Sequence, residues 1–174
     1  MIPLVLTNDR VPKLWEELEV FPALRRQLGM DTPERFWAQL TSGDNLFWNG
    51  GMAFMAALRV RPSQDADVFF AAFDRKLKEH DEDFRSALRQ LFRLGALRRV
   101  TTYTPASMAG VQKMLGRLGF RWEGVLRHGW PWDGDHADLH VNGLLREELG
   151  SAQPVVFVAP MRENGTGEVV DHGE

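Results

Sequence analysis

The stretch Leu118-Gly-Phe-Arg-Trp-Glu-Gly-Val-Leu-Arg127 marks a junction between a helix and a strand. Before it, apolar residues recur every three or four positions from Met108 to Leu118, which predicts a helix with one buried face. Gly119 stands where the end of a helix favours a left-handed residue, so we expect the helix to end there. Phe120 to Arg127 is strand-like because apolar and polar residues mix over a short run without a helical period.

The residues on either side of this junction extend an alternation of strands and helices. Downstream, a loop with the sequence Trp130-Pro-Trp-Asp-Gly134 leads to a second strand-like run at Ala137 to Leu145. Upstream, the patterns predict strands at residues 4–6, 46–48, 52–60, 68–73 and 98–103. They predict helices at residues 14–21, 32–43, 81–95 and 104–119. The last of these helices is expected to begin at Thr104-Pro105. This order indicates an α/β fold: a single domain whose mixed, mostly antiparallel sheet has about seven strands, with about four helices on its faces.

Length and composition exclude several classes of protein. At 174 residues the chain suits one domain, which we place at residues 1–160, followed by a flexible C-terminal tail at residues 161–174. The net charge of -3 gives no general attraction to nucleic acid or to an anionic membrane. The absence of cysteine excludes disulfides, thiolate metal sites and a cysteine nucleophile. With neither a basic leader nor an apolar run near the ~20 residues of a membrane span, we expect a cytoplasmic protein.

Two segments resemble the GNAT acetyltransferase family. The stretch from Leu118 to Arg127 is similar to a signature of that family: leucine, glycine, phenylalanine, two variable residues, glutamate, glycine, two variable residues and arginine. Residues 133–138 and 143–148 are similar to the last hairpin of the subgroup that acetylates the N-termini of ribosomal proteins. The resemblance implies an acetyl-CoA-dependent N-acetyltransferase that acts on an amine of a peptide or small molecule.

The resemblance also indicates where acetyl-CoA would bind. In the family, a glycine-containing loop at the start of the third helix holds the pyrophosphate on backbone N–H groups. The corresponding residues here, Glu79 to Phe84, include four carboxylates and no glycine. Carboxylates stabilise the start of a helix. They also occupy the position that a pyrophosphate needs, and they carry the same sign of charge as the pyrophosphate. The residues around this segment that are candidates for the cofactor site are Phe73, Arg75, Lys76, Lys78 and Arg85.

The candidate catalytic residues are similarly placed by analogy with the family. Asp74, or a water held by it, is the candidate general base, and Asp67 is the other carboxylate near the same strand. Tyr103 and Ser107 are candidates to stand near the leaving thiolate, because Leu115 occupies the family's tyrosine position. If the acidic loop is only an altered pyrophosphate site, replacing Glu82 and Phe84 with glycine should preserve the fold and raise the affinity for acetyl-CoA.

Two further groups of residues have alternative interpretations. Trp130 and Trp132, at the tip of the predicted hairpin, could contact a substrate or a protein partner, or could fold back over the sheet. The remaining tryptophans lie on apolar faces and are expected in the core: Trp15, Trp37, Trp48 and Trp122. Alternating residues His136, Asp138 and His140 share a strand face and could bind a metal, although an exposed polar face is the commoner meaning, and we predict no metal site.

Two functions therefore stay open. One is the N-acetyltransferase described above. The other is a catalytically inactive GNAT-fold protein that serves as a structural or protein-interaction module, by analogy with such proteins among tailed phages, including head-assembly accessory proteins. The feature that separates them is the space between the fourth and fifth strands, which is either open and lined by free N–H groups or filled by side chains.

Overall fold

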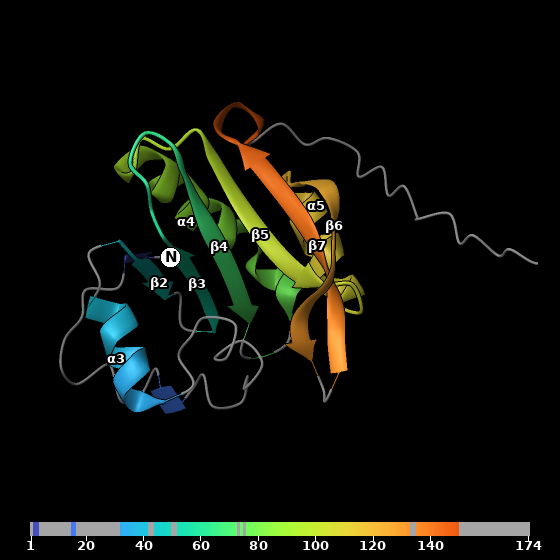
Figure 1. Cartoon of the computed structure of the whole chain (residues 1–174). Coiled ribbons are helices and arrows are strands. Elements are labelled where there is room, and N and C mark those ends of the chain that lie inside the picture. The colour runs from blue at the N-terminus through green and yellow to red at the C-terminus, as the bar shows by residue number, and fades with distance from the viewer. Residues whose placement is uncertain are drawn as a thin grey trace, which may run out of the picture.

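The computed structural model describes residues 2–3, 15–16, 32–41, 44–49, 52–72, 74, 76–132 and 135–149 (Figure 1). For residues 2–3, 40–41, 49, 130–132 and 135, it describes the backbone alone. The strands are β1 (Ile2–Pro3), β2 (Leu46–Asn49), β3 (Ala53–Leu58), β4 (Asp65–Ala72), β5 (Arg99–Pro105), β6 (Arg121–Trp132) and β7 (Asp135–Leu145). The helices are α3 (Pro33–Thr41), α4 (Asp81–Leu94) and α5 (Ala109–Leu118), with 3-10 helices η1 (Leu77–His80) and η2 (Arg146–Glu148).

The strands form one sheet in the order β1-β2-β3-β4-β5-β7-β6. Only β4 and β5 pair in parallel among the described strands, and the other pairs are antiparallel. The predicted mixed, mostly antiparallel sheet of about seven strands is therefore confirmed. Trp15 and Glu16, inside the first predicted helix, are helical, and the other three predicted helices correspond to α3, α4 and α5. No helix within the described ranges is long and apolar enough to cross a membrane.

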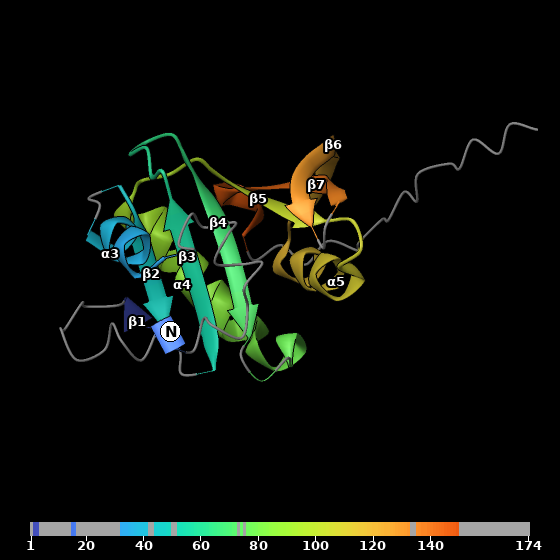
Figure 2. The ribbon, with the colours of Figure 1, turned by 60° about the horizontal axis from the view of Figure 1, so that its bottom comes forward.

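Helices α4 and α5 lie behind the sheet in the view of Figure 1, and the main core fills the space between them and the strands. Figure 2, turned by 60°, shows α4 beneath the β3–β4 half and α5 beneath the β6–β7 half. The strands bury Val68, Val100 and Leu144 against Leu88 and Leu91 of α4. Alternate strand residues point to opposite faces, so β4 directs Val68 to the helices and Asp67 to the other side.

Glycines end the two long helices as the sequence predicts. Gly119 follows α5 with a φ of 99°, in the left-handed region that residues with a Cβ disfavour. Its N–H donates to the carbonyl oxygens of Leu115 and Gly116, which lack partners within the helix. Gly95 similarly follows α4 and donates to the carbonyl oxygen of Leu91.

The prediction that Thr104-Pro105 begins a helix is wrong. Both residues belong to β5, with Pro105 paired to Leu139, and α5 begins at Ala109. Proline is tolerated there because β4 has already separated from β5, so the missing N–H leaves no bond on that side unmade. The hairpin of β6 and β7 is also longer than predicted, since Trp130 and Trp132 lie in β6 rather than in a loop.

Candidate active site

The candidate site begins where β4 and β5 separate. The two strands pair at only three positions in the described chain: Asp65 with Arg99, Ala66 with Val100, and Asp67 with Thr101. Beyond them, residues 68–72 of β4 and 102–105 of β5 diverge, and we call this region the fork. Figure 1 shows η1 and the start of α4 close to the diverging ends. Parallel strands that diverge expose backbone groups that a ligand or a neighbouring segment can approach.

Aromatic side chains fill the helix side of the fork. The ring of Phe70 in β4 meets the ring of Phe84 in α4 edge to face, with centroids 5.2 Å apart. It meets the ring of Phe120 in the same manner at 5.9 Å. Such pairs stabilise a core beyond the area that they bury. Phe84 is fully buried, so the expectation that glycine there preserves the fold is wrong: its removal would leave a large cavity.

The loop that joins β4 to η1 is closed by an aspartate and a histidine. His80 Nε2 lies 3.1 Å from both carboxylate oxygens of Asp74, and its Nδ1 lies 3.4 Å from Asp83 Oδ2. The backbone N–H of Lys76 also donates to Asp74 Oδ1, at 3.0 Å. We call these contacts the Asp74–His80 clasp. The N–H of Lys76 contributes most to lowering the pKa of Asp74 below its usual value, and the hydrogen bond and charge of His80 add to it.

The clasp decides what these two residues can do. Both ring nitrogens of His80 face carboxylates, so neither is directed at another molecule. Asp74 is likewise occupied by Lys76 and His80, which makes it a poor general base for a substrate amine. In this conformation Asp74 is bonded within the protein, and its role as a general base stays a prediction.

The first turn of α4 carries three acidic residues, each with a partner. Asp81 accepts two hydrogen bonds from Arg117 of α5, at 2.5 and 2.9 Å. Glu82 contacts Arg85 at 3.3 Å and Arg89 at 2.8 Å. Helix η1 runs into α4 without a break and lies against both β4 and α5. The start of α4 is thus acidic and packed against its neighbours.

These residues do not fit a pyrophosphate. A pyrophosphate at a helix start needs backbone N–H groups that it can approach and a favourable charge. Here the segment from Leu77 to Leu94 contains no glycine. The carboxylates of Asp81, Glu82 and Asp83 occupy the turn where a pyrophosphate would bind. The guanidinium of Arg117 is already bonded to Asp81, and this hydrogen bond is the main cause that raises the pKa of Arg117.

Of the sequence-predicted cofactor residues, the three that the structure describes have different surroundings. Phe73 and Arg75 lie outside the described residues. Lys76 forms an ion pair with Glu79 at 3.5 Å, and Lys78 is exposed in η1. Arg85 donates to the carbonyl oxygen of Arg117 at 3.2 Å, so it ties α4 to α5.

The remaining candidates lie in different surroundings. Tyr103 is on β5, with Arg99 and Thr101, on the face away from α4. Ser107 is exposed in the turn between β5 and α5. Leu115, at the family's tyrosine position, is 1% exposed in the main core. Tyr103 and Ser107 stay predictions as catalytic groups.

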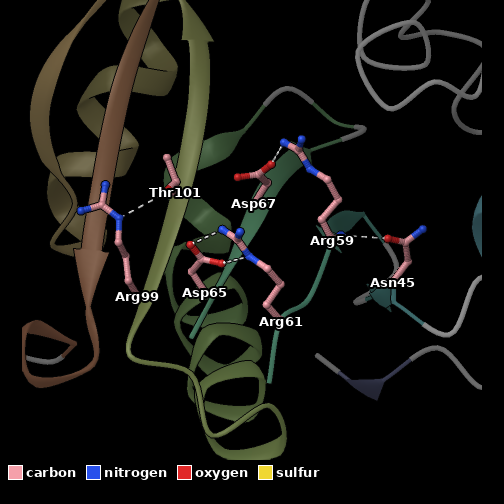
Figure 3. A network of polar contacts seen from close by, with 7 residues as sticks. All are labelled: Asn45, Arg59, Arg61, Asp65, Asp67, Arg99 and Thr101. Atoms are coloured by element: carbon pink, nitrogen blue, oxygen red, sulfur yellow. Dashed lines mark hydrogen bonds and ion pairs between the residues drawn. The ribbon is translucent and has the colours of Figure 1, made fainter. Parts of the chain in front are cut away.

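A row of ion pairs lies on the face of the sheet away from α4 and α5, and it was not predicted from the sequence (Figure 3). Arg59 bonds to Asp67, and Arg61 holds Asp65 through two hydrogen bonds of 2.5 Å. Arg99 donates to Thr101 Oγ1 at 3.1 Å and pairs with Glu123 of β6. The short separation of Arg61 and Asp65 was the only available signal, because the other partners meet through strand register. A groove of about 490 Å³ lies beside this row, lined in part by Asn45, Arg59 and Arg61.

In the stretch from Leu118 to Arg127, Gly119, Phe120 and Glu123 have structural roles. Gly119 ends α5, and Phe120 is buried against Phe70. Glu123 reaches across β7 to Arg99, and the main cause that raises the pKa of Arg99 is this hydrogen bond. A Cβ at Gly143 would overlap Glu123 Oε1 and lie 2.6 Å from Arg99 Nη2, so glycine leaves the space that the pair needs.

The expectation for two of the tryptophans needs correction. Trp48 is fully buried, as predicted, but Trp37 and Trp122 are each 46% exposed and do not belong to the core. Asp138 accepts the backbone N–H of His128 at 2.8 Å, and His140 packs against Trp122. No cluster of three histidine or acidic residues in the described parts of the chain is arranged to hold a metal.

The same arrangement of strands and helices occurs in solved acetyltransferase structures. A variant of spermidine N-acetyltransferase SpeG from Vibrio cholerae superposes with a TM-score of 0.69 at 10% identity, over 88% of this chain and 100% of that chain. RimL, an α-N-protein acetyltransferase of a ribosomal protein, superposes with a TM-score of 0.68 at 14% identity, over 82% of this chain and 88% of that chain. This chain has the GNAT fold.

A third GNAT-fold structure is a complex with a derivative of coenzyme A. RimJ from Mycobacterium smegmatis, in complex with CoA-disulfide, superposes with a TM-score of 0.60 at 18% identity, over 69% of this chain and 63% of that chain. The sequence matches no protein-family model and no curated protein. The GNAT fold confirms, at the level of architecture, the resemblance carried by the stretch from Leu118 to Arg127.

Proposed function

We propose that this protein is a GNAT-fold module for protein interaction that does not hold acetyl-CoA at the start of α4. The observation that carries the proposal is the Asp74–His80 clasp together with the acidic turn that follows it. A pyrophosphate placed there would meet the carboxylates of Asp74, Asp81, Glu82 and Asp83. Their partners His80, Arg89 and Arg117 are already bonded, so the ligand would have to break these contacts to obtain compensation.

The aromatic packing at the fork supports the same proposal. Phe70, Phe84 and Phe120 occupy the side of the fork that faces the helices. Of the two states that the sequence leaves open, an open space lined by N–H groups and a space filled by side chains, the second is the better description of this side. A fold that keeps its architecture after losing its cofactor site is suited to binding through its surface.

The surface that we assign to a partner is the end of the β6–β7 hairpin. Pro105, the last residue of β5, pairs with Leu139, so β7 residues before Leu139 extend beyond β5, as Figure 1 shows. Trp130 and Trp132 lie on this extension, opposite Ala137 and Asp135. Tryptophans on a projecting hairpin offer large rigid contact areas, which are common at the centres of protein interfaces.

The deciding experiment is a calorimetric titration of the whole protein with acetyl-CoA at low and moderate salt, with desulfo-CoA as the non-reactive control. We expect no binding of either compound. A matched variant carries Asp81→Asn and Glu82→Gln, which removes two charges and keeps the shapes of both side chains. Stoichiometric binding to the unchanged protein at micromolar concentration would contradict the proposal.

A second candidate, an N-acetyltransferase acting on a peptide or small-molecule amine, is favoured by the fork itself. The separation of β4 and β5 after Asp67 and Thr101 is retained here. Acetyl transfer to a panel of peptide and polyamine acceptors, measured by mass spectrometry, tests this candidate. Turnover that is lost in Tyr103→Phe but kept in Leu94→Ala, an exposed substitution on α4, would favour the enzyme over the interaction module.

A further inference from the structure

Strand β6 forms one edge of the sheet and exposes apolar side chains along it. It is the last strand in the order β1-β2-β3-β4-β5-β7-β6, so within the described chain its outer edge has no partner strand. Among the residues whose side chains are described, three of the six exposed large hydrophobic ones are on this strand: Trp122 at 46%, Val125 at 38% and Leu126 at 47%. A sheet edge that is both unpaired and apolar tends to accept another strand.

The exposed residues of β6 lie on both faces of the sheet. Trp122 and Val125 pair with Asn142 and His140, which are two residues apart in β7 and therefore share a face. Leu126 pairs with Leu139 and lies on the opposite face. A strand added to this edge would therefore need apolar residues on both of its faces.

The regular part of this edge is short. The register of β6 against β7 shifts between Trp122 and Gly124, and again between Leu126 and Trp130. Such bulges interrupt the row of backbone donors and acceptors and protect an edge from long partner strands. The uninterrupted run from Gly124 to Leu126 suits a short segment, and the second bulge separates it from Trp130 and Trp132.

One segment of this chain has the matching properties. Val155-Val-Phe-Val-Ala159 is a run of five apolar residues, four of them β-branched or aromatic, which strongly favour strands. Pro154 and Pro160 flank the run, and proline cannot continue a hydrogen-bonded ladder. The donor segment and the acceptor edge are therefore both short, and the donor is apolar on both faces.

The described chain ends beside the start of β6. Glu148 Oε1 accepts a hydrogen bond from Arg121 Nε at 2.9 Å, and the carbonyl oxygen of Glu148 lies against Gly119. Leu149, the next residue, packs against the main core. Residues 150–154 can span at most about 17 Å, and Gly124 lies three residues, or about 10 Å of strand, beyond Arg121. A short linker also keeps the local concentration of the segment high.

We propose that the outer edge of β6 is a strand-acceptor site and that Val155–Ala159 of the same chain occupies it, parallel to β6. The parallel direction follows from the position of Glu148 beside the first residue of β6. This inference goes beyond the proposed function, because it depends on neither acetyl-CoA binding nor a partner at Trp130 and Trp132. Its occupied edge leaves the projecting end of the hairpin available.

Cysteine cross-linking tests the proposal in the full chain, which has no cysteine of its own. Val125→Cys is combined in turn with cysteine at positions 155, 156, 157 and 158, and each pair is treated with a short bifunctional thiol reagent. We expect intramolecular products that alternate in yield along the segment, because alternate strand residues share a face. Val125→Cys with Val169→Cys is the control and should give little product.

The same experiment identifies other occupants. A yield that does not alternate, or that equals the control, would overturn the proposal. Products that join two chains, with a yield that falls on dilution, would overturn it in favour of a second copy as the occupant.

Hydrogen exchange provides a second readout that does not depend on cross-linking. We expect the amides of residues 121–126 to exchange several-fold faster in Phe157→Asp than in the unchanged protein, because a charged residue would remove the added strand. Val169→Asp, in the same tail, should leave them unchanged. Equal exchange in all three proteins would overturn the proposal, whatever the acetyl-CoA titration shows.

Discussion

Asp74 shows how one residue changes role with its surroundings. By resemblance it is a general base, yet the structure surrounds it with the N–H of Lys76 and the ring of His80. Those contacts stabilise the carboxylate and lower the pKa of Asp74. A base must accept a proton from a substrate, whereas Asp74 is arranged to stay ionised within the protein.

The lowered pKa of Asp74 predicts how stability responds to acid. The contribution of this carboxylate is fully present above the pKa of about 3.9 of an unfolded chain and is lost as pH falls through the lower folded value. Asp74→Asn should therefore reduce the loss of stability on acidification, measured as the urea midpoint between about pH 6 and about pH 3.

Glu147→Gln, at an exposed position in η2, is the control for this comparison. A carboxyl-carbon titration by nuclear magnetic resonance should also place Asp74 below the range of an ordinary aspartate. A titration at or above that range would mean that the clasp does not form in solution.

At the scale of the element, strand β7 is crossed by the Arg99–Glu123 pair. Gly143 lies beneath that pair and leaves no room for a methyl group. Gly143→Ala should displace the ends of these two flexible side chains and cost about 0.5–1 kcal/mol of unfolding free energy. Gly110→Ala is the matched control, because nothing lies within 4 Å of its added Cβ and alanine favours the helix.

Chemical denaturation measures both glycine variants. We expect Gly143→Ala to lower the midpoint and Gly110→Ala to leave it unchanged or raise it. Equal midpoints would show that the Arg99–Glu123 pair moves aside without cost.

The hairpin of β6 and β7 gives a second prediction for an element. If Trp130 and Trp132 project toward a partner, replacing each with serine should change the unfolding free energy by no more than about 0.5 kcal/mol. Trp48→Ala, at a fully buried position in β2, should cost about 3–5 kcal/mol. Losses of comparable size in the hairpin variants would indicate that the indoles fold back over the sheet.

How far the sequence predicts this molecule depends on the range of the interaction. Helix periodicity and Gly119 locate α5, because both act within a few residues. Pro105 misled the assignment of its start, because a proline is compatible with either a helix start or a strand that has lost a neighbour. The exposure of Trp122 follows from the edge position of β6, which depends on the strand order rather than on local pattern.

Some features of the candidate site can likewise be predicted from the sequence, and others cannot. The acidic, glycine-free start of α4 is visible in the amino-acid sequence, and its charge alone argues against a bound pyrophosphate. Contacts that depend on the tertiary arrangement are not visible in the sequence. Asp81 of α4 meets Arg117 of α5, and Phe70 of β4 meets Phe120, which precedes β6.

At the scale of the whole molecule, the Arg117–Asp81 pair joins the two helices behind the sheet. Arg117→Ala should cost about 1 kcal/mol, because two hydrogen bonds at partly buried positions are lost. Arg89→Ala, which breaks a more exposed pair with Glu82, should cost less than about 0.5 kcal/mol.

A double-mutant cycle with Asp81→Asn isolates the coupling between the two partners. A coupling close to zero would mean that the Arg117–Asp81 pair does not help to hold α4 and α5 together. A measurable coupling would identify the pair as a link between the two halves of the fold.

The brief contact between β4 and β5 has a mechanical consequence. Within the sheet, the strands from β1 to β4 and the strands from β5 to β7 are joined by three residue pairs. The first group of strands lies within residues 2–72 and the second within residues 99–145, so the two groups do not interleave along the chain. When the two groups are pulled apart, the sheet should tear along this seam, beginning beside Asp67 and Thr101, where the strands have already separated.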